Sequence, residues 1–535
     1  MSVPHGRTPP VEAAGPGFSL RAVGRTALTL GAGTAASQVL VFGRELVISS
    51  RVGASLTLDA LLIALVVPNM LTGFLSHGTA TALVPIYVET LAAKGQREAR
   101  RLAGTVISWV LLVGVVLGVA TLLGSQVVVA TSGPGLGAPA QAHAAAYLPL
   151  LVPMGIVAAL AGILTAVCQA EDRFRVIGVG LVLNPAVTIA VVLAAWPTLG
   201  IGSVPVGLLL GAVAACSWLL GSTVRGGYAP IPNLRGTGAV PAFWRHAAPL
   251  SLSSMIGQAN RFTDRAVASL TGVGAVSSLR FGQYLMEAPI AAIANAWSMA
   301  IYPTLARATR DERPEAFGEG ATRALMYIIA AFTPLAVGVA ALAPIAVDVV
   351  YRRGAFGADA ALTTSIVVAA LAPMVLVLMA RTVVISAHNA RARGRLLLAN
   401  GVMNVTSNAI LNLALGLTFG VVGVALSTTL TMSTLLLFLI HRMRRYDPGF
   451  DPRAIGMLFV RCLAASLVPA VPIAVYAWST SLRGDTAVSL ITLAGLGLLG
   501  AVTYMVVAAR FGAREVGALR RALVQRLGRR RAAGA

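Results

Sequence analysis

Long apolar segments recur along almost the whole chain, and short polar connections separate them. A helix needs about 20 mainly apolar residues to cross a bilayer. Alanine, leucine and glycine dominate these segments, and the apolar–polar alternation of a membrane strand is absent. The pattern predicts an all-α integral membrane protein with fourteen transmembrane helices, near residues 27–50, 57–88, 103–127, 143–169, 175–197, 201–222, 244–270, 278–305, 323–350, 361–389, 396–418, 420–440, 457–479 and 486–509.

Basic residues gather in every second connection. The connection after the second segment holds Lys94 and three arginines, whereas residues 128–142 and 271–277 contain no basic residue. Positive charge marks the cytoplasmic side of a membrane protein. The alternation therefore predicts an even number of spans with both termini in the cytoplasm, and its exceptions are Arg51, Arg352, Arg353 and Arg483.

The composition agrees with a membrane protein. Of the 535 residues, 57% are hydrophobic and 11% charged, against about 25% charged in soluble domains. A net charge of +22 would suggest nucleic-acid binding in a soluble protein. Here the arginines follow the membrane topology, which excludes nucleic acid and indicates membrane lipids as partners. The cysteines Cys168, Cys216 and Cys462 lie in apolar segments without CxxC spacing, so packing is their expected role.

A weak internal repeat divides the chain. The run from Asp59 to Pro68 is echoed by Gln283 to Pro289, and Asn184 by Asn412. Repeated halves are common in secondary transporters. The repeat predicts two pseudo-symmetric six-helix lobes plus two extra C-terminal helices. The expected domains are a cytoplasmic leader (1–26), an N-lobe (27–222), a cytoplasmic inter-lobe linker (223–243), a C-lobe (244–440), the last two spans with the basic loop before them (441–509) and a basic cytoplasmic tail (510–535).

Several predicted spans contain charged or amide side chains. A charge in the bilayer centre costs about 2.5–3.5 kcal/mol on insertion scales, so such residues face a partner or a water-filled cavity. Arginine suits phosphate groups because its planar fork donates two parallel hydrogen bonds. We expect a central cavity with a positive lining. The candidates for substrate binding are Arg44, Arg261, Arg265, Arg280, Gln38 and Asn260, and those for ion coupling or gating are Asp59, Glu287, Asp264 and Glu45.

Each candidate also has a structural interpretation. Asp264 could form an ion-paired knot with its neighbouring arginines, since residues three and four apart share a helix face. Arg44 and Glu45 could lie at the membrane interface, and Asp59 could cap the start of its own helix. The histidines His77 and His388 are more often hydrogen-bonding groups than proton relays.

Signatures of catalysis are missing from the sequence. It contains no GxxxxGK[ST] loop, no HExxH metal motif and no GxSxG elbow. We therefore expect no enzymatic activity, no catalytic residues, no bound metal and no cofactor. An ion gradient or the membrane potential would supply the driving force.

The run RELVISSRVGASLTLDALLIALVVPNMLTGFLSHGTATALVPIYVE, residues 44–89, resembles the start of the MurJ/MviN lipid II flippases of the MOP exporter superfamily. The motifs Asp264-Arg265, Gly274-Ala-Val-Ser277 and Leu285-Met286-Glu287-x-Pro289 follow in the family's order. The resemblance implies alternating access and a cationic cavity for a polyprenyl-pyrophosphate-linked saccharide, lipid II or a related precursor of the cell envelope. It also implies the bacterial cytoplasmic membrane as location, and a lipid-tail groove formed by the last two spans.

The chain departs from the family pattern at several cavity positions. Gln38, Thr72, Gly73 and Tyr284 stand where the family commonly has basic residues, and His77 where it often has an acid. Two other functions stay open for this reason. One is a MOP-type drug or cation antiporter. The other is a non-transporting scaffold that recruits envelope-synthesis proteins through the basic tail.

Overall fold

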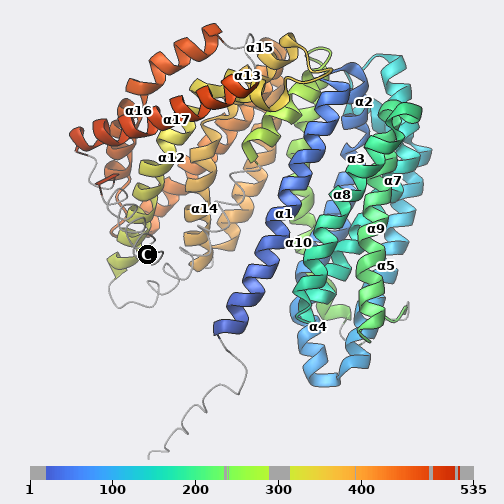
Figure 1. Ribbon diagram of the computed structural model, residues 1–535. Helices are drawn as coiled ribbons and strands as arrows, with labels where there is room; N and C mark the ends of the chain where they lie inside the picture. Colours follow the sequence, from blue (N-terminus) through green and yellow to red (C-terminus); the bar gives the residue numbers. More distant parts are fainter. Residues whose placement is uncertain are drawn as a thin grey trace, which may run out of the picture.

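The computed structural model describes residues 20–233, 238, 240–287, 314–391, 393–480, 486–512 and 516–517. Every regular element in these ranges is a helix, which confirms the all-α prediction (Figure 1). Most of the expected leader, Pro289, Pro303 and nearly all of the basic tail lie outside the described residues.

The first half of the chain forms the right-hand part of the molecule in Figure 1. Apolar runs interrupted by glycine and proline give long helices with short breaks. They are α1 (Leu20–Val52), α2 (Leu56–Ala64), α3 (Val66–Thr72), the π-helix η1 (Gly73–His77), α4 (Gly78–Lys94), α5 (Gln96–Leu123), α6 (Ser125–Ser132), α7 (Ala138–Ala170), α8 (Phe174–Leu199), the 3₁₀ helix η2 (Gly200–Gly202) and α9 (Ser203–Arg225).

The second half lies to the left in the same view. Its α10 packs against α15 of its own half and against α4 and η1 of the first half, so it belongs to the interface between them. The elements are α10 (Val240–Ser269), a helix described over 275–287, α12 (Pro314–Tyr351), α13 (Ala358–Leu371), α14 (Met374–Ala390), α15 (Gly394–Tyr446), α16 (Pro452–Thr480) and α17 (Thr486–Arg510).

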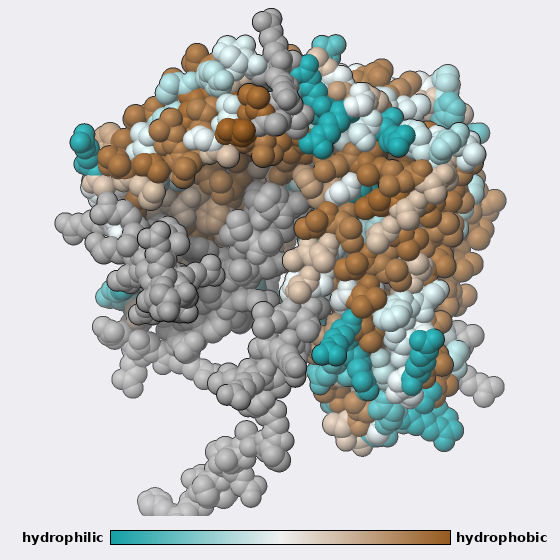
Figure 2. Space-filling view, in the orientation of Figure 1, coloured by the Kyte–Doolittle hydropathy of each residue, from teal (hydrophilic) through white to brown (hydrophobic). Residues whose placement is uncertain are grey.

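Nine helical stretches of the described chain are long and apolar enough to cross a membrane. Seven of them hold one predicted span each. The other two, Phe174–Arg225 and Gly394–Tyr446, hold two predicted spans each. Figure 2 shows the matching surface, where apolar side chains cover the flank of the first half and polar ones gather at its lower end. The chain is therefore a multi-span membrane protein, and the total of fourteen remains a prediction.

The two halves share local backbone geometry at a constant offset. Arg173 (φ −89°, ψ 52°) and Arg393 (φ −84°, ψ 50°), 220 residues apart, begin α8 and α15. Gly200 and Gly420, also 220 apart, both have positive φ, which glycine adopts without strain. This offset places Asn184 opposite Asn404, eight residues before the Asn412 with which the sequence comparison paired it.

Each half contains a non-helical segment, after α9 in the first half and after α15 in the second, that crosses a glycine of a long helix in the same half. In the first half, Ile231 N–H donates to Arg100 O (3.0 Å), and a Cβ on Gly104 would overlap the Ile231 carbonyl. In the second half, Asp451 N–H donates to Thr322 Oγ1 (3.0 Å), and a Cβ on Gly318 would overlap the backbone of residues 448–450. We call residues 226–233 and 447–451 the exit straps.

Candidate substrate cavity

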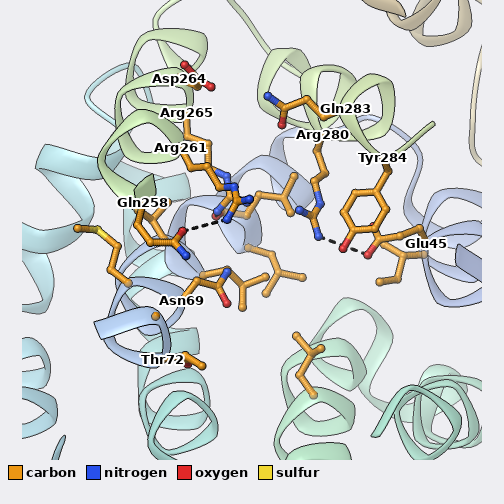
Figure 3. Close-up of a pocket in the computed structure, with 18 of the residues that line it drawn as sticks. Glu45, Asn69, Thr72, Gln258, Arg261, Asp264, Arg265, Arg280, Gln283 and Tyr284 are labelled. Atoms are coloured by element: carbon orange, nitrogen blue, oxygen red, sulfur yellow. Dashed lines mark hydrogen bonds and ion pairs between the residues drawn. The ribbon is translucent and has the colours of Figure 1, made fainter. Parts of the chain in front are cut away.

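A cavity of about 470 Å³ lies between the two halves, roughly midway along the helices (Figure 3). The first half contributes lining from α1, from α2 to η1 and from α7 to α9. The second half contributes α10 and the helix over 275–287. The sides with α2 and α9 are apolar, whereas α1, α10 and the 275–287 helix bring the charged groups. Four arginines line it: Arg44, Arg261, Arg265 and Arg280.

Glu45 on α1 holds two of these arginines. Its Oε1 lies 3.0 Å from Arg44 Nη2 and 3.5 Å from Arg280 Nη2. The Arg280 guanidinium also lies over the Tyr284 ring, 3.9 Å from its centroid, a geometry that favours a cation. Two guanidiniums thus share one carboxylate, and the ion pair Glu45–Arg280 links the first half to the second.

Arg261 and Arg265 on α10 have a different environment. Arg261 Nη1 donates to Gln258 Oε1 (3.1 Å), and Arg265 Nη1 donates to the Leu62 carbonyl (3.1 Å). Neither arginine forms a salt bridge with any residue the structure describes. Both arginines line the cavity, as Figure 3 shows.

The Asp264 carboxylate turns away from both neighbouring arginines (Figure 3). Its Oδ1 accepts a hydrogen bond from Asn412 Nδ2 (2.6 Å) on α15, which also donates to Asn408 Oδ1 (2.9 Å). Ser427 Oγ donates to Asn412 Oδ1. The ion-paired knot considered for the α10 arginines is therefore not formed. Asp264 instead joins a buried polar network between α10 and α15.

Asp59 is not in the cavity lining and lies in the first turn of α2, a helix at the upper end of the molecule in Figure 1. It does not cap its own helix, because Ser55 is the N-cap of α2. Its carboxylate accepts the backbone N–H of Gly274 (2.7 Å) and of Ser277 (2.8 Å), and the Ser277 hydroxyl. Asp59 thus caps the helix over 275–287, which belongs to the other half.

Further contacts close the same end. Ala355 N–H donates to Ser50 O (2.9 Å), and Gly135 N–H donates to Ser269 Oγ (3.0 Å). Toward the lower end, η1 meets α10, where Ser254 Oγ donates to Gly73 O (2.9 Å). Single π-turns inside helices often occur at functional sites, and this one forms part of the cavity wall.

Seven predicted site residues line the cavity, and three do not. Those in the lining are Arg44, Glu45, Arg261, Asp264, Arg265, Arg280 and Glu287. Gln38 is exposed on α1, and Asn260 is buried one turn before Asp264 on the same face of α10. These two and Asp59 are not cavity residues, so the substrate-binding role predicted for Gln38 and Asn260 has no support here. Sequence reasoning did not assign Gln258 or Asn69 to the site, although Gln258 lies three residues before Arg261. Tyr284, named there as a departure from the family pattern, does line the cavity.

The comparisons with known proteins agree with this architecture. A family model described as "Lipid II flippase MurJ" matches residues 48–495. A probable lipid II flippase MurJ of Synechocystis sp. is 26% identical over 80% of this chain and 83% of its own length. Another from Vibrio cholerae is 23% identical over 92% of this chain and 96% of its own.

Solved structures share the fold. A lipid II flippase MurJ in an inward closed conformation superposes with a TM-score of 0.76, covering 90% of this chain and 98% of that one at 20% identity. An inward-facing multidrug resistance MATE transporter of the MOP superfamily gives 0.61, covering 76% and 94% at 16% identity. Because the family model matches most of the sequence, the chain belongs to the lipid II flippase MurJ family.

Proposed function

We propose that the protein is a transporter, not an enzyme, that moves lipid II across the bacterial cytoplasmic membrane by alternating access. The substrate class is the polyprenyl-pyrophosphate-linked saccharides, to which lipid II belongs. The observation that carries the proposal is the cavity between the halves, which is lined by four arginines, two of which share the Glu45 carboxylate. Diphosphate oxygens accept the paired donors of a guanidinium, and a cavity shielded from water strengthens that attraction.

Alternating access follows from how the halves meet. The upper end is closed by the Asp59 cap and by the Ser50–Ala355 hydrogen bond. The predicted topology places this end outside the cell. Opening it would break these hydrogen bonds and would also separate apolar side chains, because buried residues of both halves, such as Leu58 and Val276, belong to one hydrophobic cluster. Rocking of repeated halves around a midplane site is the usual motion of secondary transporters.

Ion coupling is the proposed role of the Asp264 network. A carboxylate buried among amide and hydroxyl groups is costly in the bilayer unless it binds a proton or a cation. Asn412 Nδ2 donates to its Oδ1, and Asn408 and Ser427 extend the same hydrogen-bonded network. Arg261 and Arg265 on the same helix line the cavity. Binding or release of an ion at Asp264 would therefore act on Arg261 and Arg265 through α10, which carries all three residues. Glu287, which also lines the cavity, is a second coupling candidate.

The finer architecture belongs to the same proposal. We assign fourteen spans, in two lobes of six and an additional pair that helps to hold the lipid tail. Both termini are placed in the cytoplasm, and the basic tail binds anionic lipid or envelope-synthesis proteins.

Transport by purified protein in proteoliposomes tests the function. We expect accessibility of fluorescent lipid II to an outside reagent to rise with wild-type protein and to stay at background with Arg265→Glu. A cationic dye efflux assay on the same vesicles tests the antiporter, whose substrate the arginine lining would repel. Dye efflux without lipid II transport would overturn the proposal. Loss of cell-envelope function on removing 515–535, with lipid II transport at background in both proteins, would favour the scaffold.

A further inference from the structure

The two arginine pairs of the cavity differ in how their charge is compensated. Arg44 and Arg280 share the Glu45 carboxylate, and their side chains are 14% and 23% exposed. Arg261 and Arg265 contact only neutral oxygens, the amide of Gln258 and the carbonyl of Leu62. An anion that enters the cavity must displace Glu45 to bind the first pair fully, whereas no carboxylate in the described part of the chain forms a salt bridge with the second pair.

The second pair is arranged to bind one anion with both arginines. Residues four apart lie on one helix face, and both arginines line the same cavity. Like charges repel each other, so an anion bound between the two arginines gains from both. Each guanidinium has five N–H donors, and one donor on each is used by a described neutral partner. The remaining donors match the several oxygens of a diphosphate.

Gln258 fixes where Arg261 points. Its carbonyl oxygen accepts from Arg261 Nη1, while its NH₂ group faces Gly73, where a Cβ would lie 3.0 Å from Gln258 Nε2. A side chain at position 73 would displace Gln258. The Ser254–Gly73 hydrogen bond keeps η1 against α10 at this point. The missing side chain of Gly73 therefore leaves the space in which Gln258 holds Arg261.

We infer that Arg261 and Arg265 form the diphosphate subsite of the cavity, and that Gln258 is the positioning residue for Arg261. The Arg44–Glu45–Arg280 cluster then ties the halves together and is not the first site of anion binding. This inference rests on the proposed function, because it names the residues that take the anionic part of its substrate. Thr72 and Gly73, where α3 meets η1, stand where the family commonly has basic residues. The inference explains how this cavity can still bind an anion, because α10 supplies the positive charges.

Binding of undecaprenyl diphosphate to the full-length protein in detergent tests the inference, with undecaprenol as the uncharged probe. Wild type should prefer the diphosphate. Arg261→Gln and Arg265→Gln should each lower that preference about tenfold or more, because a hydrogen bond to a charged group is lost. Arg44→Gln should lower it less, since Glu45 already occupies that arginine. Undecaprenol binding should stay the same in every variant that is folded.

Gln258 has its own pair of variants. Gln258→Glu places a carboxylate on Arg261, so diphosphate preference should fall while thermal stability is kept or raised. Gln258→Leu should lower the preference in wild type but have no further effect in Arg261→Gln, because the two residues act together. Gln126→Glu, at an exposed position of α6, is the control for net charge and should leave the preference unchanged.

The outcomes separate the two claims. No preference for diphosphate in wild type would contradict the proposed function itself. A wild-type preference that survives Arg261→Gln and Arg265→Gln, but is lost in Arg44→Gln, would overturn only the inference. Equal losses from Gln258→Leu in both backgrounds would show a merely structural role for Gln258.

Discussion

The Asp59 carboxylate accepts a hydrogen bond of 2.8 Å from the backbone N–H of Ser277. Asp59 precedes Ser277 by 218 residues and lies in the other half of the molecule. Gly274 N–H and the Ser277 hydroxyl complete the cap. The first turn of a helix carries free N–H groups and a partial positive charge, so a carboxylate suits it. The state with the upper end closed therefore depends on one acid of the first half.

Asp59→Asn should weaken this closure, because the amide keeps an acceptor but loses its negative charge. The expected cost is about 1 kcal/mol or somewhat more, since the cap is buried. We expect a larger fraction of molecules with the upper end open, measured as faster labelling from outside of a cysteine placed at the buried Ala275. Asp359→Asn, in the exposed first turn of α13, is the matched control and should leave labelling unchanged.

Glu45→Gln should destabilise the protein strongly. It leaves Arg44 and Arg280 without their shared carboxylate, and removing one partner of a buried ion pair costs about 3–5 kcal/mol. The melting temperature in detergent should fall by several degrees. Glu319→Gln breaks an ion pair with Arg323 whose side chains are 52% and 72% exposed, so it should cost at most about 1 kcal/mol. Equal shifts in both variants would contradict the role given to Glu45.

Asp264→Asn should separate transport from its driving force. The amide preserves size and keeps an oxygen for Asn412 Nδ2, but it cannot exchange a proton or hold a cation by charge. We expect lipid II movement down its own gradient to persist, while acceleration by an imposed ion gradient disappears. Acceleration equal to that of wild type would remove Asp264 from the coupling proposal and leave Glu287 as the remaining candidate.

Gly104→Val should disrupt the exit strap of the first half. The Ile231 carbonyl occupies the position of a side chain at 104, so strap or helix must shift, at a cost of about 1–3 kcal/mol for overpacking. Digestion of the strap by protease should become faster. Gly221→Ala, with open space around its Cβ in α9, should instead be neutral or stabilise the helix by up to about 1 kcal/mol. Unchanged digestion of Gly104→Val would show that the strap is not held there.

The apolar pattern and the buried charges predicted much of the molecule. Arg44, Arg261, Arg265 and Arg280 all reach one cavity, because charges in spans have few other places to go. Sequence spacing was less informative about Asp264. Arg261 shares a face with both Asp264 and Arg265, but those two are adjacent and point about 100° apart on a helix. One therefore faces α15 and the other the cavity.

Other features depend on tertiary structure that spacing does not contain. The partner of Asp59 is more than two hundred residues away, so its role as a cap across the halves could not be predicted. Gln38 lies on an exposed part of α1, and nothing in an amphipathic pattern says where along a helix a cavity ends. Gln258 is neutral, and burying an amide costs less than burying a charge. Its presence in a span is therefore a weaker indication of a binding site.

A reversible cross-link across the upper end tests alternating access most directly. Ser50 and Ala355 are joined by a backbone hydrogen bond of 2.9 Å between the halves, so a disulfide between cysteines at these two positions would hold the upper end closed. We predict that lipid II transport in proteoliposomes stops when the Ser50→Cys/Ala355→Cys protein is oxidised and returns after reduction, while each single variant transports throughout. Undiminished transport by fully cross-linked protein would contradict the account.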